Sequence, residues 1–322
     1  MFNLGEKEKK NSFPVKFCDI IQKKVRLSPF TSFKIGGNAD IYITPSSPEE
    51  LEAALIFIQE ERIPAILLGG GSNLLIPDEG IRGAVIHTCR LNKILPVKSA
   101  GDRFVQAEAG ALMQDLTEFC AEHGITGLED FAGLPGTVGG AVFMNARCYE
   151  KSISDVLVSV SALRFSEKNC TIKEYEYRQE DWGYKRSPFQ PQNKRYAELN
   201  ESRTVILSAT FRVEQGDAML IRKTMENRIA DRESKGHFKL PSAGSIFKNN
   251  HAFGKPSGQL IDEAGLRGLQ IGGAQVAPWH GNFIVNTGSA TAREIAELIE
   301  AIQKRVKDKT GFELEPEIIF AG

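Results

Sequence analysis

The sequence predicts a protein of the α/β or α+β class. The chain begins with an apolar strand, a capped helix and a second apolar strand, and further strands and amphipathic helices follow. Its 322 residues, 41% hydrophobic and 25% charged, are enough for about two domains with a cleft between them. This composition excludes disordered and fibrous proteins.

The first strand–helix–strand unit is marked by its capping residues. ADIYITP (39–45) is predicted to be a strand, and a helix is predicted to start after Ser47. Ser47 can cap this helix, Pro48 suits its first position, and Glu50 is expected to complete a capping box. AILLGG (65–70) then has the composition of a buried strand.

The later strands and helices are predicted in the same way, from the spacing of apolar residues and from capping residues. A domain boundary is predicted near residue 215. The predicted elements are strands at 83–88, 104–110, 156–165 and 205–213, helices at 113–122, after Asp217 and from the capping box of Thr291 and Glu294 to Gly311, and a last short strand in FELEPEIIFAG (312–322).

Charge and composition exclude several classes of function. Forty basic and forty-one acidic residues do not provide the basic face of a nucleic-acid-binding protein. No apolar stretch approaches the roughly 18 residues of a membrane span, and the first residues lack the apolar core of a signal peptide. The five cysteines form no CxxC pair, and the histidines form no HExxH motif. We therefore expect a cytoplasmic protein with no membrane insertion, no metal site and reduced cysteines.

Two glycine clusters are candidates for binding a phosphate group. GGGSNLL (69–75) follows a buried strand, where successive N–H groups of a turn can form an anion-binding nest. In GLPGTVGGAVFMNA (133–146), a short helix can begin at Val138 with its N–H groups toward a phosphate. Neither cluster is a GxGxxG fingerprint or ends in GK[ST]. The clusters suggest a nucleotide-like cofactor held in another way, the alternative for the first being an ordinary tight turn.

Five strings, in this order, resemble the UDP-N-acetylenolpyruvoylglucosamine reductase family from about residue 20 onward: TSFKIGG (31–37), LGGGSNLLI (68–76), GLPGTVGGAVFMNA (133–146), PSAGSIFKN (241–249) and LEPEIIF (314–320). The resemblance implies an α+β fold, with a two-lobed FAD-binding module of the vanillyl-alcohol-oxidase (PCMH) kind and a C-terminal α+β substrate-binding domain. Lobe 1 would span 1–95 together with strand 313–322, lobe 2 would span 96–214, and the substrate-binding domain would span 215–312.

The resemblance also implies an activity. NADPH would reduce bound FAD, and the reduced flavin would deliver hydride to UDP-N-acetylglucosamine enolpyruvate, giving UDP-N-acetylmuramate for bacterial peptidoglycan. The ligand would be a UDP-sugar, and no protein partner would be required. The residues implied to hold the cofactor are Gly69, Gly70, Gly71, Ser72, Asn73, Leu74, Gly133, Pro135, Gly136, Thr137, Gly139, Gly140, Asn145 and Arg232.

Two residues carry the chemistry implied by the resemblance. Ser245 would protonate the carbon next to the hydride acceptor, and Glu317 would hydrogen-bond the carboxylate region of the substrate. Without the resemblance, Ser245 would be an ordinary turn serine and Glu317 a solvated charge on a terminal strand.

The sequence departs from the family pattern at the residue that meets the substrate carboxylate. In GYKRSPF (183–189), Lys185 stands where the family has arginine, and Arg186 follows it. Lysine offers a point charge and arginine a planar fork, so both remain catalytic candidates. The segment 145–151 departs as well, because Arg147 and Cys148 replace a small pair.

The residues implied to bind the rest of the substrate are Tyr149, Tyr184, Lys235 and Asn249. Lys235 and Arg232 form an Arg-x-x-Lys pattern, for which the alternative is a basic helix end that complements the helix dipole. Two other functions compete with the implied one. One is a flavin oxidase or dehydrogenase that acts on alcohols, and the other is a flavin-bound sensor without activity.

Overall fold

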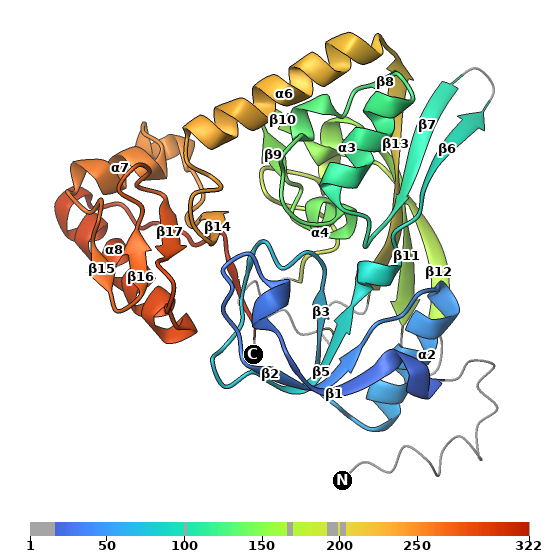
Figure 1. Cartoon of the computed structure of the whole chain (residues 1–322), viewed down its shortest axis with the longest axis horizontal. Helices are drawn as coiled ribbons and strands as arrows, with labels where there is room; N and C mark the ends of the chain where they lie inside the picture. The colour runs from blue at the N-terminus through green and yellow to red at the C-terminus, as the bar shows by residue number, and fades with distance from the viewer. Residues whose placement is uncertain (1–16, 100–101, 166–169, 192–198, 200–203, 322) are drawn as a thin grey trace.

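The structure is a computed structural model that describes residues 17–99, 102–165, 170–191, 199 and 204–321. Three sheets of four or more strands organise this part of the chain. The first two lie beside each other, and the third belongs to a separate part at the far end of a long helix, as Figure 1 shows. None of the described helices is long and apolar enough to cross a membrane.

The first sheet has the strand order β1-β2-β5-β3. Its strands are β1 (Ile21–Arg26), β2 (Asn38–Ile43), β5 (Ile81–His87) and β3 (Ala65–Leu68). The β1–β2 pair is antiparallel, whereas β2 and β3 are parallel to β5. Helix α2 (Pro48–Glu60) buries Leu51, Ala54, Leu55 and Ile58 in a core shared with the second sheet.

The predicted capping box of α2 is wrong in one of its two bonds. The Ser47 hydroxyl does accept a hydrogen bond from the Glu50 N–H. The Glu50 carboxylate, however, accepts from the N–H and hydroxyl of Ser46, at 2.6 and 2.8 Å, instead of from the Ser47 N–H. A second serine before the cap offers this carboxylate two donors, and the sequence pattern does not distinguish the two partners.

The second sheet is antiparallel and has the order β12-β11-β13-β7-β6, with β8 paired to the end of β13. Its strands are β12 (Cys170–Glu176), β11 (Leu157–Phe165), β13 (Thr204–Gln215), β7 (Asp102–Glu108), β6 (Ile94–Ser99) and β8 (Ile125–Thr126). Helices α3 (Met113–Glu122) and α4 (Val138–Phe143) and the short strands β9 (Arg147–Cys148) and β10 (Lys151–Ser152) complete this part.

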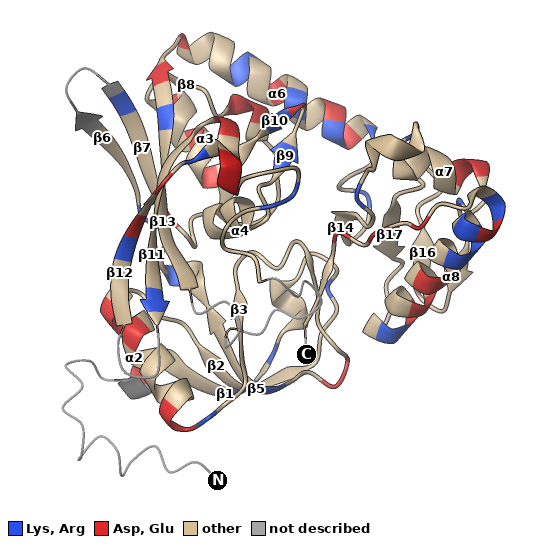
Figure 2. Cartoon of the chain, turned by 180° about the vertical axis from the view of Figure 1, so that it is seen from behind, with Lys and Arg blue, Asp and Glu red and all other residues tan. Residues whose placement is uncertain are grey.

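Helix α6 (Ala218–Ser234) connects the second sheet to the third part of the molecule (Figure 1). The Asp217 carboxylate caps it by accepting from the N–H groups of Met219 and Leu220. Its buried Ile221 and Met225 pack on Ala121 and Ala132, beside α3. Although the helix packs on the second part, the division near residue 215 remains a prediction. Figure 2 shows acidic and basic residues interspersed along α6 and α8.

The third part contains an antiparallel sheet of order β14-β17-β16-β15 and two helices. Its elements are β14 (Ser242–Ser245), α7 (Ser257–Glu263), β15 (Gln270–Ile271), β16 (Ala274–Val276), β17 (Phe283–Asn286) and α8 (Ala292–Thr310). The capping box of Thr291 and Glu294 is confirmed, and Gly311 ends α8 at a φ of 77°.

The last described strand returns to the first part. Strand β18 (Ile319–Phe320) pairs in parallel with β4 (Leu74–Leu75), directly after the first glycine cluster. The predicted final strand is therefore shorter than expected, and Glu313, Glu315 and Glu317 precede it.

Buried in the first part, His87 leads to a prediction about acid stability. The Tyr42 hydroxyl lies 2.5 Å from His87 Nδ1, and burial lowers the pKa of His87 to about 4. Because the unfolded chain then binds a proton at higher pH than the folded one, stability is lost as pH falls from about 6.5 toward 4. We expect this residue to contribute about 3 kcal/mol to that loss of unfolding free energy.

The measurement is urea unfolding of the wild type and of His87→Gln across this pH range. The difference in unfolding free energy between the two proteins should shrink as the pH falls. A difference that stays constant with pH would contradict the assignment. His123→Gln, an exposed histidine beyond the end of α3, is the control for the loss of an imidazole.

Candidate active site

Ser245 and Glu317 line the same cleft because two distant segments pair through their backbones. The Glu317 N–H donates to the carbonyl of Ile246 at 2.7 Å, and the Lys248 N–H donates to the carbonyl of Glu315 at 2.9 Å. The Asn73 amide, from the first glycine cluster, donates to the carbonyl of Glu317 at 3.0 Å. Hydrogen bonds thus hold the backbone of Glu317 from two segments, residues 246–248 on one side and Asn73 on the other.

Ser245 is the last residue of β14, and the irregular pairing of this strand just before it requires glycine. Gly244 has a φ of 72°, a left-handed conformation that side chains with a Cβ seldom adopt. Within the described part of the chain, the Ser245 hydroxyl makes no hydrogen bond. It is therefore available to a molecule in the cleft.

Lys185 is the cation that meets Glu317. Its Nζ lies 2.6 Å from Glu317 Oε1, and the two side chains are only 15% and 12% exposed. Lys185 has a φ of 55° and lies in a tight turn, in which Gly183 and Arg186 exchange two backbone hydrogen bonds. This turn directs the lysine into the cleft.

Arg186 and Tyr184, the neighbours of Lys185, lie differently. Both are exposed, Tyr184 at 43%, and neither is among the described residues that line the clefts. The register therefore places Lys185, and not Arg186, beside Glu317. Tyr184 is not brought to the cleft that contains the other substrate candidates.

The Asn145 side chain holds the turn that carries Lys185. The buried Asn145 amide donates to the carbonyl of Gly183 at 2.8 Å and accepts from the Ser154 N–H at 3.0 Å. The Ser187 hydroxyl and the Gln190 amide both donate to the carbonyl of Phe143. Asn145 does not line the described clefts, so its side chain positions the lysine turn instead of facing a ligand.

The two glycine clusters face each other. A Cβ on Gly70 would lie 2.4 Å from Gly136 Cα, and one on Gly69 would lie 2.7 Å from the Thr137 hydroxyl. This close approach explains why glycine occupies both loops. Their residues border an apolar cleft, which contains Gly69, Gly70, Gly71, Ser72, Asn73, Leu74, Thr137, Gly139 and Gly140.

The first loop also offers unused donors. Within the described part of the chain, the backbone N–H groups of Gly70, Gly71, Ser72 and Asn73 donate to no other group. Consecutive free N–H groups beside a cleft suit a diphosphate. Of the other cofactor candidates, Pro135 lines the neighbouring cleft that contains Ser245. Gly133 and Gly136 do not line either cleft but support the loops, and Gly133 packs against the Arg232 side chain.

The contact between the loops makes Gly70→Ala a direct test of this geometry. The new methyl group would collide with backbone, which cannot move as a side chain end can, so we expect a loss of about 1–3 kcal/mol of unfolding free energy. Gly140→Ala is the matched control, because its Cβ would meet only the Thr137 hydroxyl, at 3.5 Å. Equal melting temperatures for the two variants would contradict the close approach.

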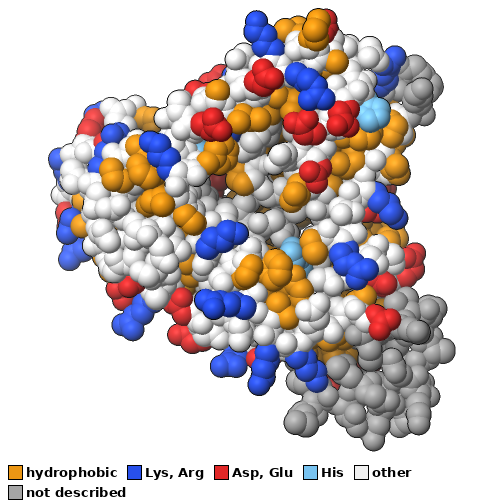
Figure 3. Space-filling model, viewed as in Figure 1, with side chains coloured by type: hydrophobic (Ala, Val, Ile, Leu, Met, Phe, Trp, Pro, Cys, Tyr) orange, Lys and Arg blue, Asp and Glu red, His pale blue; other side chains and the backbone are white. Residues whose placement is uncertain are grey.

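The cleft that contains Ser245, Lys185 and Glu317 has a volume of about 600 Å³. Figure 3 shows the surface hollowed between the part with α7 and α8, on the left, and the rest of the molecule. Further residues of the cleft are Arg147, Cys148, Tyr149, Asp231, Arg232, Lys235, His237, Asn249 and His280. Three of the four substrate candidates, Tyr149, Lys235 and Asn249, are thus brought together with the catalytic candidates.

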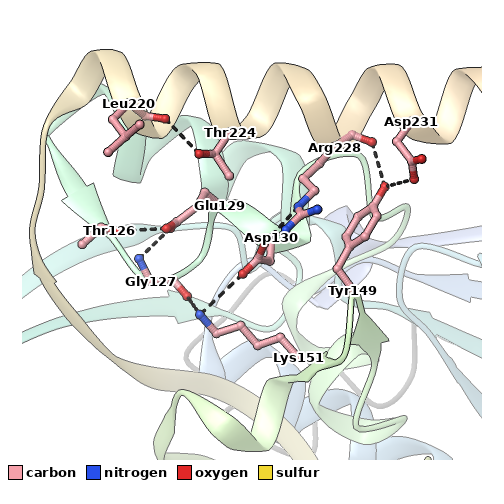
Figure 4. Close-up of polar contacts among 10 residues, drawn as sticks. All are labelled: Thr126, Gly127, Glu129, Asp130, Tyr149, Lys151, Leu220, Thr224, Arg228 and Asp231. Atoms are coloured by element: carbon pink, nitrogen blue, oxygen red, sulfur yellow. Dashed lines mark hydrogen bonds and ion pairs between the residues drawn. The ribbon is translucent and has the colours of Figure 1, made fainter.

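Tyr149 lines this cleft and contacts residues of α6, and Figure 4 shows these contacts. Its hydroxyl lies 2.9 Å from the carbonyl of Arg228 and 2.8 Å from Asp231 Oδ2, and burial raises its pKa to about 12. Arg228 donates through two nitrogens to Asp130, at 3.0 and 2.8 Å. Lys235 Nζ lies 2.6 Å from Asp231 Oδ2. The helix end is thus held by a polar network that includes two substrate candidates.

Comparisons with known proteins identify the family of the chain. Residues 39–166 match a family model described as an FAD binding domain, and residues 236–321 match the C-terminal domain of UDP-N-acetylenolpyruvoylglucosamine reductase. A protein of that name from Treponema denticola is 53% identical, with 92% of each chain covered, and one from Treponema pallidum is 46% identical, with 94% of each covered. The chain belongs to the UDP-N-acetylenolpyruvoylglucosamine reductase family.

A solved structure supports the family fold. The crystal structure of UDP-N-acetylenolpyruvylglucosamine reductase from Thermus caldophilus matches with a TM-score of 0.72 at 30% identity. The match covers 92% of this chain and 98% of that one. The α+β fold with an FAD-binding module, expected from the sequence of this reductase-family chain, is therefore confirmed.

Sequence reasoning missed two histidines of the reductase-family cleft. His237 and His280 both pack on Phe283, with ring centroids 4.7 and 4.2 Å away. Burial lowers the pKa of His237 to about 4 and also lowers that of His280. His237 could have been found from the sequence, because it lies two residues after the substrate candidate Lys235. No sequence pattern singles out His280, because the turn before β17 brings it to the cleft.

Proposed function

We propose that this chain reduces UDP-N-acetylglucosamine enolpyruvate to UDP-N-acetylmuramate, in the synthesis of bacterial peptidoglycan, with NADPH as the reductant and FAD as its bound cofactor. The observation that supports the proposal most directly is the common cleft of Ser245, Lys185 and Glu317, beside the glycine loops. A flavin protein that oxidises alcohols would have no use for this set.

The glycine loops fit the cofactor. The free N–H groups of Gly70, Gly71, Ser72 and Asn73 would hold its diphosphate, and the apolar cleft between the loops would accept a flat ring or a ribityl chain. When bound, FAD supplies the hydride that is added to the enol ether. Residues 133–140 would border it from the opposite side.

Lys185 and Glu317 would bind the carboxylate of the substrate. An ammonium group has three donors, and the ion pair with Glu317 uses one of them. The other two can point to carboxylate oxygens, on which negative charge increases as the hydride is added. Because both side chains are mostly buried, this charge interaction is weakly screened by solvent.

Ser245 would supply the proton to the carbon beside the one that receives the hydride. Its hydroxyl is free of hydrogen bonds within the described chain, and the next residue, Ile246, accepts a backbone hydrogen bond from Glu317. A hydroxyl is a weak acid, so it acts well only where it is held against the carbon that becomes basic. The short backbone pairing of residues 246–248 with residues 315–317, directly after Ser245, provides this rigidity.

The nucleotide part of the substrate would extend toward α6. Lys235, Arg232 and Tyr149 lie on that side of the cleft, and Asn249 lies near Ser245 along the chain. Lys235 would exchange its contact with Asp231 for a phosphate oxygen of the UDP-sugar. Tyr184 would reach the substrate only if the turn that carries it moved.

We also propose that the protein acts in the cytoplasm and needs no protein partner. Four of the five cysteines, Cys89, Cys120, Cys148 and Cys170, are free thiols, as in proteins of a reducing compartment. All the proposed catalytic groups come from this one chain.

The test follows the two half-reactions separately. The purified protein should show a flavin absorption spectrum that NADPH bleaches without oxygen. Adding the enolpyruvyl UDP-sugar should then restore the oxidised spectrum with formation of UDP-N-acetylmuramate. A bleached flavin that is indifferent to this substrate would overturn the proposal, and reoxidation coupled to an alcohol or ketone would favour the other enzyme class.

A further inference from the structure

Cys148, one of the two residues at which segment 145–151 departs from the family pattern, lies in the cleft. It belongs to β9, is 6% exposed and lines the cleft together with Lys185 and Tyr149. Arg232 Nη2 lies 2.9 Å from its sulfur atom. A guanidinium group is rarely satisfied by sulfur, which is a weak acceptor.

Arg232 itself lacks a full set of partners. It is only 7% exposed, and its Nε is buried with no hydrogen-bond partner within the described chain. Burying a polar group without a partner costs free energy, so an anion that accepts a hydrogen bond from this nitrogen would be favoured. The geometry of guanidinium is suited to carboxylate and phosphate oxygens.

Two other cations of the cleft are balanced by carboxylates. Lys185 pairs with Glu317, and Lys235 pairs with Asp231. Arg232 makes no ion pair with a carboxylate in the described part of the chain. The region around the Cys148 sulfur is therefore positively charged and can attract a small anion.

We propose that Cys148 is a covalent modification site for small carbon electrophiles that carry a carboxylate. Arg232 binds the carboxylate and thereby holds the reactive carbon beside the sulfur. With iodoacetate as the probe, the sulfur forms a bond to the methylene carbon, the carbon–iodine bond breaks, iodide leaves, and the thiol proton goes to solvent. No oxidant or reductant is needed.

We expect the alkylation of Cys148 to be slow but selective for the reagent that carries a carboxylate. Burial raises the pKa of the Cys148 thiol, although the charges of Arg232 and Lys185 act in the opposite direction. Less thiolate is present at neutral pH as a result. The labelling is therefore best done at mildly alkaline pH, and the comparison is between two reagents at the same pH.

The experiment treats the purified, flavin-bound protein with iodoacetate or with its neutral analogue iodoacetamide, and measures alkylation of each cysteine by peptide mass spectrometry. At Cys148, iodoacetate should react faster than iodoacetamide by about fivefold or more. At Cys170, a half-exposed cysteine of β12, the preference for iodoacetate should be absent. UDP should slow the reaction at Cys148 and leave Cys170 unaffected.

Arg232→Gln tests the role of the guanidinium group. In this variant, Cys148 should lose its preference for iodoacetate while Cys170 keeps its wild-type rates, which would also show that the fold is intact. If Cys148 reacts only after denaturation, or reacts with both reagents at the same rate in the wild type, the proposal is overturned. If the variant does not fold, the proposal is still tested by the comparison of the two reagents on the wild type and by the protection of Cys148 by UDP.

A second measurement connects the site to turnover. Carboxymethylation adds a bulky anion between Arg232 and Lys185, so iodoacetate should abolish most of the activity of the wild type. Cys148→Ala should retain activity and be resistant to iodoacetate. Inactivation of Cys148→Ala at the wild-type rate would contradict the assignment. Because mass spectrometry detects the label directly, the site can be tested even if the proposed reaction is wrong.

Discussion

Replacing Ser245 by alanine is expected to lower the rate of UDP-sugar reduction by about 10²–10⁴-fold, the range typical of a lost general acid. Flavin reduction by NADPH should stay near the wild-type rate, because that step transfers no proton from this hydroxyl. The two rates are separated by stopped-flow absorbance, first with NADPH alone and then with substrate added to the reduced protein.

The matched control for this variant is Ser242→Ala. Ser242 lies on the same strand, β14, but is not among the described residues that line the cleft. The Ser242→Ala variant should leave the rates of both half-reactions within a few-fold of the wild-type rates. If Ser245→Ala instead slows both half-reactions equally, the serine supports cofactor binding or folding, and another group must donate the proton.

Replacing Lys185 by methionine is expected to lower kcat/KM for the UDP-sugar by about 100-fold or more, the usual cost of removing one donor that stabilises developing oxyanion charge. The variant also leaves the Glu317 carboxylate buried without its partner, which adds electrostatic repulsion toward the substrate carboxylate. Steady-state kinetics with varied substrate measures the effect.

Arg186→Met is the control that the chain itself offers. The exposed Arg186 carries the same charge one residue later, so a small effect on kcat/KM is expected, within about threefold. Lys185→Arg should recover part of the activity, because arginine also donates to carboxylates. A larger loss for Arg186→Met than for Lys185→Met would reverse the assignment, and melting temperatures of both variants would exclude unfolding as the cause.

The sequence predicted best what depends on neighbouring residues. Helix α3 has the predicted bounds of 113–122, and the capping box and Gly311 define α8, because caps act within one turn of the chain. The misassigned partner of Glu50 in α2 is an error of one residue within such a local pattern. The free N–H groups of the first glycine loop could also be predicted, because they follow from its turn.

Contacts between distant segments could not be predicted in the same way. The choice between Lys185 and Arg186 depends on the left-handed turn at 183–186 and on the buried amide of Asn145, which holds it. The approach of Gly70 to Gly136 and the arrival of His280 at the cleft likewise depend on how whole sheets pack. Neither hydrophobic period nor residue spacing encodes such packing.

The parallel pairing of β18 with β4 has a consequence for how the protein is made. The Asn73 carbonyl accepts from the Ile319 N–H, so this loop is completed by residues that leave the ribosome long after it. A nascent chain that has emerged only to residue 300 would have both glycine clusters but neither Glu317 nor the strand beside Asn73. Flavin loading should therefore wait until residues 317–320 have emerged.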